Sequence, residues 1–235
     1  MHLFKIEPGF IDNGRITVEK DDLIHIKKVL RKGAGDLLYF TDSRNIYKAR
    51  IEKIESRRII CLITEKKEIT APGTVALDLY IALIQFSRFE QMLNDATQLG
   101  VRAIYPVRTE YTQNYAIPPD KFKRWEKIIQ EAANQSFNPV PPILDQRVRE
   151  LDQTSQTGKT KILLYPQAEE SLKQVLSRST DREISLYIGP EAGFSPKEME
   201  WARSRQFHTA RLPGLIMRAE TAVVSAISSI LFYFN

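Results

Sequence analysis

The spacing of apolar residues in the first 70 positions predicts short strands and one helix. Runs rich in β-branched and aromatic side chains are separated by polar turn sequences. Leu23, Ile26 and Leu30 recur at helical spacing, which predicts a helix over about residues 21–31. We expect residues 1–70 to form a small β-barrel. The expected strands are Tyr39-Phe40, 46–54 and 59–64.

The pattern changes after a charged stretch at residues 66–73 that ends in Pro72-Gly73 and predicts a linker. Apolar runs suited to buried strands then alternate with helical segments. This alternation predicts a mainly parallel sheet covered by helices, in a second domain over residues 74–235. The expected strands are 75–83, 103–107, 161–165, 184–188 and 209–212, and the expected helices are 88–99, 120–136, 169–177, 196–206 and one from residue 219 onward.

Three loops of the second domain each follow a predicted strand and lead into a helix: residues 164–166, 189–193 and 212–222. The helix after the second loop has a clear start, with Ser195 as N-cap, Pro196 in the first turn and an acidic residue three positions after the cap. Ligands of open α/β sheets bind beyond the carboxyl ends of the strands. Glycine allows a ligand to approach the backbone closely. A simple turn is the better explanation for any one of these loops, but three of them in register favour a ligand site.

The composition of the chain limits the partners and the cellular location that are compatible with such a site. The chain has 235 residues, 43% of them hydrophobic, and a formal net charge of +5. That charge is compatible with a polyanionic partner and equally with a role in solubility alone. Cys61 is the only cysteine, so an internal disulfide is excluded and a cytoplasmic location is expected. We expect no secretion signal, because the first eight residues contain no apolar segment of the required kind. We expect no membrane span, because serines interrupt the long apolar stretch over residues 222–234, which is also too short.

Common catalytic motifs are absent from the sequence. It contains no GxxxxGK[ST] phosphate loop, no GxGxxG after the first strand and no GxSxG nucleophile turn. His2, His25 and His208 are scattered and have no cysteine partners, so no metal site is expected. The sequence therefore contains none of the usual motifs for phosphoryl transfer, dinucleotide-dependent redox chemistry or serine hydrolysis.

Two of the loops carry sequences with a family resemblance. IGPEAGFSPKE, residues 188–198, and LPGLIMRAETA, residues 212–222, resemble the signatures GPEGGxxxxE and LGxxILRxETA. These signatures belong to the 16S ribosomal RNA (uracil-N3) methyltransferases, the RsmE family of the SPOUT superfamily. HIKKVLRKGAGD, QLGV and KRWEKIIQEAANQS, at residues 25–36, 98–101 and 123–136, are also similar to that family, in the same order. The resemblance thus covers nearly the whole chain.

The resemblance implies an N-terminal PUA-like β-barrel, a C-terminal α/β domain with a deep trefoil knot, and a homodimer. It also implies S-adenosylmethionine as methyl donor and 16S rRNA of the small ribosomal subunit as substrate. The catalytic candidates are Arg218, Glu220 and Glu191, and Arg218 and Glu220 either pair with each other or touch the substrate. The implied cofactor-binding residues are Leu164, Tyr165, Gly189, Gly193, Leu212, Gly214, Leu215, Ile216, Met217, Thr221 and Ala222.

RNA binding is expected at basic residues on and after the first helix, since positive side chains neutralise phosphates without reading sequence. An ordinary solvated basic face is the alternative for each lysine, whereas Arg31 lies within the VLR motif. The expected RNA-binding residues are His25, Lys27, Lys28, Arg31 and Lys32.

The chain departs from the family pattern at several positions. Ala192 replaces the middle glycine of GPEGG, directly after the glutamate, and Leu215 stands where the family often has arginine. Asp95, Tyr111 and Asn138 replace residues that are basic in the family. Two alternatives stay open for this reason: a SPOUT methyltransferase with another RNA target, or a catalytically silent RNA-binding or ribosome-assembly factor. A third interpretation, a generic basic α/β protein with a small-molecule ligand, is disfavoured because it would require the family motifs to occur by chance.

Overall fold

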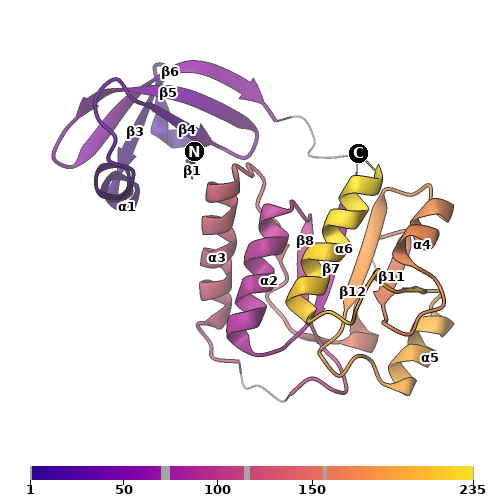
Figure 1. Ribbon diagram of the computed structural model, residues 1–235. Helices are drawn as coiled ribbons and strands as arrows, with labels where there is room; N and C mark the ends of the chain where they lie inside the picture. The colour runs from indigo at the N-terminus through magenta and orange to yellow at the C-terminus, as the bar shows by residue number, and fades with distance from the viewer. Residues whose placement is uncertain (1, 70–74, 114–116, 156–157, 235) are drawn as a thin grey trace. The chain divides into compact units, whose positions relative to one another are not determined.

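The computed structural model describes residues 2–69, 75–113, 117–155 and 158–234 (Figure 1). The chain folds into two compact units. The first comprises residues 1–72 and 133–140, and the second comprises residues 73–132 and 141–235. Each unit has its own hydrophobic core and is described by itself.

The first unit contains a six-stranded sheet in the order β1-β4-β5-β6-β3-β2. Its pairs are antiparallel except for β1 with β4. Register shifts between Lys48 and Ala49 and between Ile51 and Lys53 interrupt the β5–β6 pair, and such irregularities increase the curl of a sheet. The buried inner face includes Phe40 and Cys61. The strands are β1 (Leu3–Lys5), β2 (Ile11–Asp12), β3 (Arg15–Glu19), β4 (Leu37–Thr41), β5 (Asn45–Ile54) and β6 (Arg58–Glu68), and η1 (Pro8–Phe10) is a 3₁₀ turn.

The single helix expected in this unit is present but has two parts. A short α-helix, α1 (Lys20–Ile24), continues directly into the π-helical turn η2 (His25–Val29). The Leu30 N–H donates to the carbonyl of His25, five residues back, at 3.0 Å. The expected linker is shorter than predicted at its start, because residues 66–68 pair with β5 as the end of β6. Residues 70–73 of that linker lie outside the described residues.

The second unit contains a seven-stranded sheet in which every described strand pair is parallel. Its order is β10-β8-β7-β12-β11-β13, and β9 also pairs with β8. The expected α/β architecture is therefore confirmed. The strands are β7 (Ala76–Ala82), β8 (Ala103–Arg108), β9 (Ile143–Leu144), β10 (Arg149–Glu150), β11 (Thr160–Leu164), β12 (Glu183–Ile188) and β13 (His208–Ala210).

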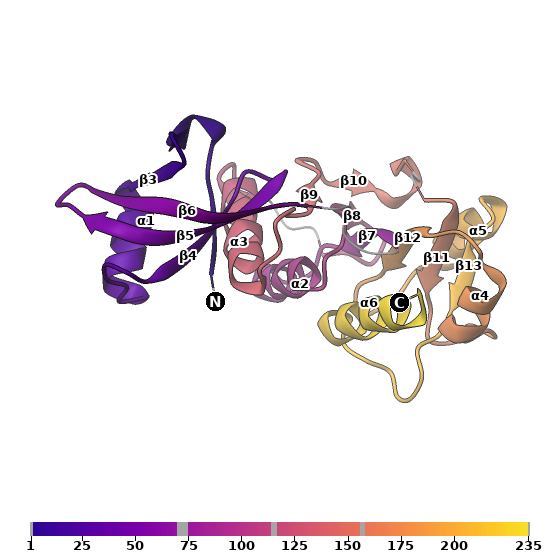
Figure 2. The same cartoon turned by 90° about the horizontal axis from the view of Figure 1, so that it is seen from above.

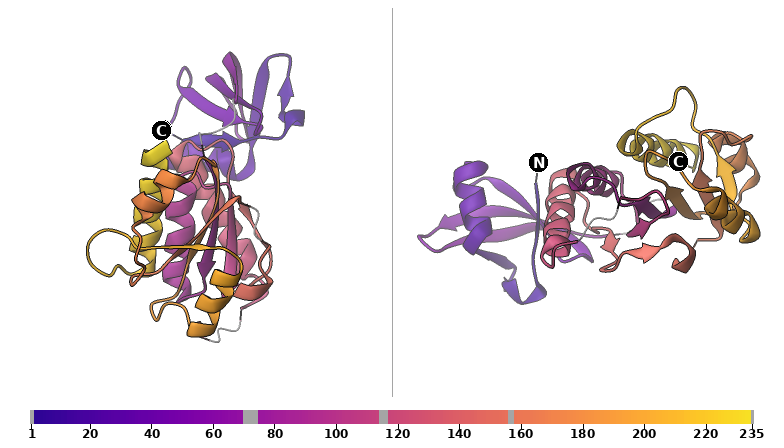
Figure 3. Two further views of the ribbon diagram at one scale, coloured as in Figure 1. Left: turned by 90° about the vertical axis from the view of Figure 1, so that its right-hand side faces the viewer. Right: turned by 90° about the horizontal axis from the view of Figure 1, so that it is seen from below.

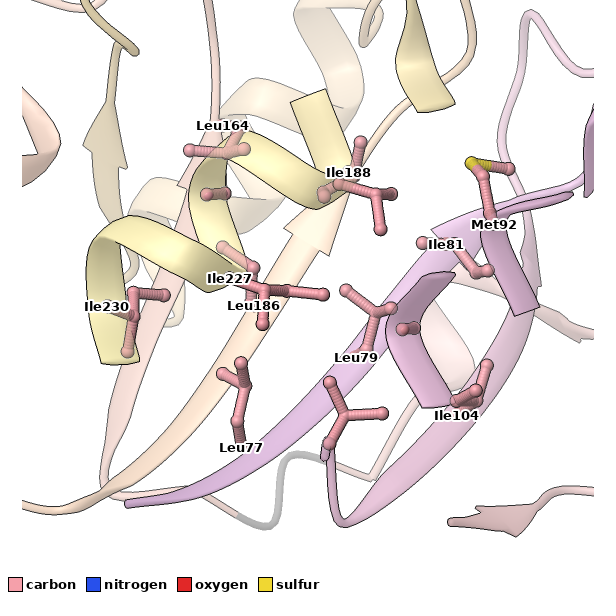
Figure 4. Packing of buried hydrophobic residues seen from close by; sticks show 14 of the residues in the cluster. Leu77, Leu79, Ile81, Met92, Ile104, Leu164, Leu186, Ile188, Ile227 and Ile230 are labelled. Atoms are coloured by element: carbon pink, nitrogen blue, oxygen red, sulfur yellow. The ribbon is translucent and has the colours of Figure 1, made fainter. Parts of the chain in front are cut away.

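Alternate residues of each strand point to opposite faces of the sheet, and several helices cover one of these faces. Leu77, Leu79 and Ile81 of β7 lie in the core beneath these helices. Figure 2 shows α2, α6 and α4 on the same side of the sheet, and Figure 4 shows apolar side chains of β7 and β12 facing those of α6. The helices contributing to this core are α2 (Phe86–Gln98), α3 (Lys121–Ser136), α4 (Leu172–Arg178) and α6 (Ala219–Phe234).

The opposite face carries three stacked tyrosines, one from each of three neighbouring strands. The Tyr80 ring lies 4.5 Å from that of Tyr105 and 4.2 Å from that of Tyr187, centroid to centroid, with nearly parallel planes. The three residues are directly opposite one another in the strand register. The 3₁₀ turn η3 (Leu151–Gln153) and the helix α5 (Pro196–Ser204) contribute further apolar residues to this second core. No helix in the described part of the chain combines the length and apolar character needed to cross a bilayer.

Candidate cofactor and active site

The three glycine- and proline-containing loops converge at the carboxyl edge of the second sheet. β12, β11 and β13 are neighbours, so the loops that leave their carboxyl ends meet at one place. A pocket of about 220 Å³ lies between them. Its lining consists of Leu164, Tyr165, Pro166, Ile188, Gly189, Pro190, Glu191, Gly193, Phe194, Ala210, Arg211, Leu212, Pro213, Gly214, Leu215, Ile216, Met217, Ala219 and Ala222.

Local geometry requires glycine at two points of this lining. Gly193 has φ +76° and Gly214 has φ +90°, in the left-handed region that other residues adopt at a cost. The Gly193 N–H donates to the Pro190 carbonyl at 2.9 Å and closes the turn after β12. The predicted helix start follows directly: Ser195 Oγ accepts from the Glu198 N–H at 3.2 Å, and a Glu198 carboxylate oxygen accepts from the Ser195 N–H at 2.8 Å. This capping box confirms the N-cap prediction and fixes where α5 begins.

The loop between β13 and α6 projects away from the rest of its unit (Figures 2 and 3). Leu215 is 90% exposed and Ile216 is 79% exposed, although both line the pocket on one side. At the base of this loop, the Arg211 guanidinium donates to the Ala168 carbonyl at 2.8 Å. The loop therefore has a fixed base and an apolar tip open to solvent.

Most of the residues expected to hold a cofactor line this single pocket. Leu164, Tyr165, Gly189, Gly193, Leu212, Gly214, Leu215, Ile216, Met217 and Ala222 all belong to the lining. Thr221 does not; its side chain is exposed in the first turn of α6. Phe194, Ala210 and Arg211 line the pocket without having been predicted. Phe194 lies within the motif of the second loop but was not among the predicted residues. Ala210 ends β13 and Arg211 follows it, so both come just before the motif that begins at Leu212.

The two candidate acidic residues meet at a third residue that sequence reasoning missed. Arg88, near the start of α2, donates from Nε and Nη2 to the two carboxylate oxygens of Glu220 at 3.2 and 2.6 Å. Its Nη1 donates to Glu191. The hydrogen bond from Arg88 holds the pKa of Glu220 below its usual value, so this carboxylate is ionised at neutral pH. Glu191 lines the pocket, whereas Glu220 does not.

Arg218 is not the ion-pair partner of Glu220, which is one of the two roles considered for it. Its side chain is exposed, and its guanidinium makes no hydrogen bond or ion pair with the part of the chain that the structure describes. Arg218 precedes α6 directly, next to the pocket-lining Met217 and Ala219. Arg218 itself is not part of the pocket lining.

The expected RNA-binding residues of the first unit differ in their surroundings. Lys28 and Arg31 are exposed. The Lys27 ammonium donates to the Glu55 carbonyl at 2.8 Å, and the Lys32 ammonium lies 3.8 Å from an Asp36 carboxylate oxygen. His25 is half-buried, and its ring packs against those of His2 and Phe4.

Family models match both units of the chain. An RNA methyltransferase domain matches residues 71–231, and an RNA methyltransferase PUA domain matches residues 18–64. The first match alone covers more than half of the chain. The fold is thus that of an RNA methyltransferase, and the expected SPOUT-type fold with a PUA-like N-terminal unit is confirmed.

Proteins named ribosomal RNA small subunit methyltransferase E are similar along nearly the entire length. The Rickettsia conorii protein is 28% identical, over 96% of this chain and 93% of its own length. The protein from Buchnera aphidicola of Acyrthosiphon pisum is 30% identical, over 90% of this chain and 85% of its own. A methyltransferase from Legionella pneumophila, solved with bound SAM, is 25% identical with a TM-score of 0.82, over 97% of this chain and 96% of its own. The chain belongs to the ribosomal RNA small subunit methyltransferase E family.

Proposed function

We propose that this protein uses S-adenosylmethionine to methylate N3 of one uridine in the 16S rRNA of the small ribosomal subunit. One observation supports this proposal most strongly. Three separate loops form a single pocket, and its lining includes most of the residues that the family motifs assign to the cofactor. A chain that had lost its activity would have no need to keep this pocket intact. The reaction class and the small-subunit substrate follow the names of its relatives.

The pocket residues suit this cofactor. Leu164, Ile188 and Phe194 offer apolar surface to a flat purine ring, while the loop backbone offers donors and acceptors. Glu191 adds a negative charge next to the space that a cationic ligand would occupy. When bound, S-adenosylmethionine supplies an electrophilic methyl group on a positively charged sulfur.

The protein's own groups must position the uracil ring and accept the proton that leaves its N3. The N3–H of uracil is weakly acidic, so negative charge develops on the ring when this proton leaves. Arg218 is exposed at the pocket and carries no competing ion pair among the described residues, so it can stabilise that charge. The target uridine must also leave its stack to reach a pocket formed by loops.

Three further features belong to this proposal: a knotted C-terminal region, a homodimer and a cytoplasmic location. Two observations support the dimer. Phe232 near the end of α6 is 89% exposed, and the tip of the loop before α6 is apolar and exposed. The exposed Lys28 and Arg31 would add phosphate contacts from the PUA-like unit.

The decisive experiment is a methylation assay with defined substrates. Small ribosomal subunits that lack N3-methyluridine are incubated with the protein and S-adenosylmethionine labelled in the methyl group, and the RNA is digested for mass spectrometry of its nucleosides. We expect N3-methyluridine at one site. Labelling of transfer RNA or another ribosomal site instead would identify a different RNA target. Absence of cofactor binding would favour the silent RNA-binding factor.

A further inference from the structure

Arg88 occupies a position that helix physics disfavours. It is the third residue of α2, and the N-terminal end of a helix carries partial positive charge that repels a cation. The first turn of α2 contains no acidic residue, and its N-cap residue Gln85 makes no side-chain capping bond. A residue that breaks a local rule usually has a role in tertiary structure or function.

Two carboxylates on other elements compensate for the unfavourable position of the Arg88 charge. Glu220 lies in the first turn of α6, which packs beside α2, and Glu191 lies in the turn after β12. The Arg88 side chain is 25% exposed and that of Glu220 is 22% exposed, so water screens this pair only in part. One guanidinium thus joins two helix starts to a pocket-lining turn, across separations of 132 and 103 residues in sequence.

We propose that Arg88 is a positioning residue for the cofactor: it holds Glu191 and the turn at residues 189–193 in the shape that binds S-adenosylmethionine. This inference rests on the proposed function. Arg88 itself does not line the pocket, so its effect passes through Glu191. Glu191 is 54% exposed and would move freely in solvent without this partner.

The geometry explains why arginine rather than lysine occupies this position. The planar guanidinium offers separate N–H groups in fixed directions and here uses Nε and Nη2 for Glu220 while Nη1 serves Glu191. An ammonium is a point charge on a flexible stem and holds two carboxylates less well in one geometry. Arg88→Lys should therefore restore only part of what Arg88→Ala removes.

The test measures cofactor affinity by calorimetry on the full-length protein. We expect Arg88→Ala to weaken S-adenosylmethionine binding about tenfold or more, equivalent to about 1.4 kcal/mol, with Arg88→Lys in between. A double-mutant cycle with Glu191→Gln should show coupling, because the second substitution removes the group through which Arg88 acts. The melting temperature of each variant is measured alongside, to separate loss of binding from loss of folding.

Arg124→Ala is a matched control. Arg124 makes an equally bidentate contact with Glu90, at 2.8 and 2.9 Å, in the same unit. This variant should keep the wild-type affinity. An Arg88→Ala protein with a lower melting temperature but unchanged affinity would overturn the positioning role, and so would additive effects in the cycle. A wild-type protein that binds no S-adenosylmethionine would overturn the proposed function and this inference with it.

Discussion

Arg218 and Glu220 are two positions apart, yet their side chains have opposite surroundings. Glu220 is held by Arg88 and is partly buried, whereas the Arg218 side chain is exposed beside the pocket. Glu220 therefore joins the start of α6 to α2, and Arg218 is the residue that we propose for the chemistry. A charge that stabilises a transition state must be free to meet charge that develops on the substrate.

This difference predicts the phenotype of Arg218→Ala. Loss of one group that stabilises developing charge typically lowers kcat by about 100-fold or more. Calorimetry should show unchanged binding of S-adenosylmethionine, because the Arg218 side chain makes no hydrogen bond or ion pair with the described residues and does not line the pocket. Arg205→Ala, an exposed arginine after α5, is the control and should keep full activity. Equal losses of kcat in both variants would argue for general RNA attraction instead.

Gly193 is the second residue with a specific prediction. Its φ of +76° is strained for any residue with a Cβ, by about 1–2 kcal/mol. Gly193→Ala should lower the free energy of unfolding by this amount and weaken cofactor binding, as measured by denaturation and calorimetry. Gly9→Ala is the control, because Gly9 has an ordinary φ and open space around it. Unchanged binding in Gly193→Ala would mean that the turn tolerates another shape.

Local sequence predicted most elements but not their order in the sheets. Ser195 and Glu198 marked the start of α5 because a capping box is encoded within four residues. The π-helical turn η2 was not foreseen, since Leu23, Ile26 and Leu30 fit an ordinary helix equally well. β9 and β10 have two residues each, which is too short for any periodic pattern. β7 pairs with β12, more than 100 residues further along the chain, and local propensity contains no information about this pairing.

The turn between β4 and β5 carries a prediction about acid stability. Burial raises the pKa of Asp42, but hydrogen bonds from the Tyr47 hydroxyl and from the Arg44 and Asn45 backbone outweigh it and lower the pKa to about 2. A carboxylate with a depressed pKa stabilises the fold above its ordinary value of 3.8, and this stabilisation is lost as the pH falls toward 2.

Asp42→Asn should therefore lower the urea midpoint near neutral pH, by about 1 kcal/mol of unfolding free energy for a partly exposed site. The gap from the wild-type protein should close as the pH falls from about 4 to 2. Urea titrations at a series of pH values measure it. A gap that stays constant over this range would show that the charge of Asp42 is not what stabilises the turn.

At the scale of the whole molecule, exposed apolar groups on and before α6 predict the assembly state. Phe232 is 89% exposed and Tyr233 is 42% exposed. Burial of such a side chain at the centre of an interface can contribute 2 kcal/mol or more. Phe232→Asp should convert the proposed dimer to a monomer in light scattering after gel filtration. Phe10→Asp, on an exposed apolar residue of the first unit, should leave the mass unchanged.

The family motifs predicted the pocket well because they are contiguous in sequence and each occupies one loop. The Arg88 contacts could not be predicted in this way. Arg88 lies more than 100 residues from both carboxylates, and only the order of strands and helices brings the three together. Closeness in sequence is also a poor guide to the partner of Glu220, because its ion pair is with the distant Arg88, while Arg218 acts on it only as a nearby charge.

The buried position of Cys61 in the first core has a practical consequence for labelling. Burial raises the pKa of this thiol to about 12, so almost none of the reactive thiolate exists at neutral pH. As the only cysteine of the chain, it should stay silent toward maleimides while the protein is folded. In a Leu215→Cys variant the new thiol would then be the only one to take up a dye or spin label, so this variant can report movements of that loop without prior removal of Cys61.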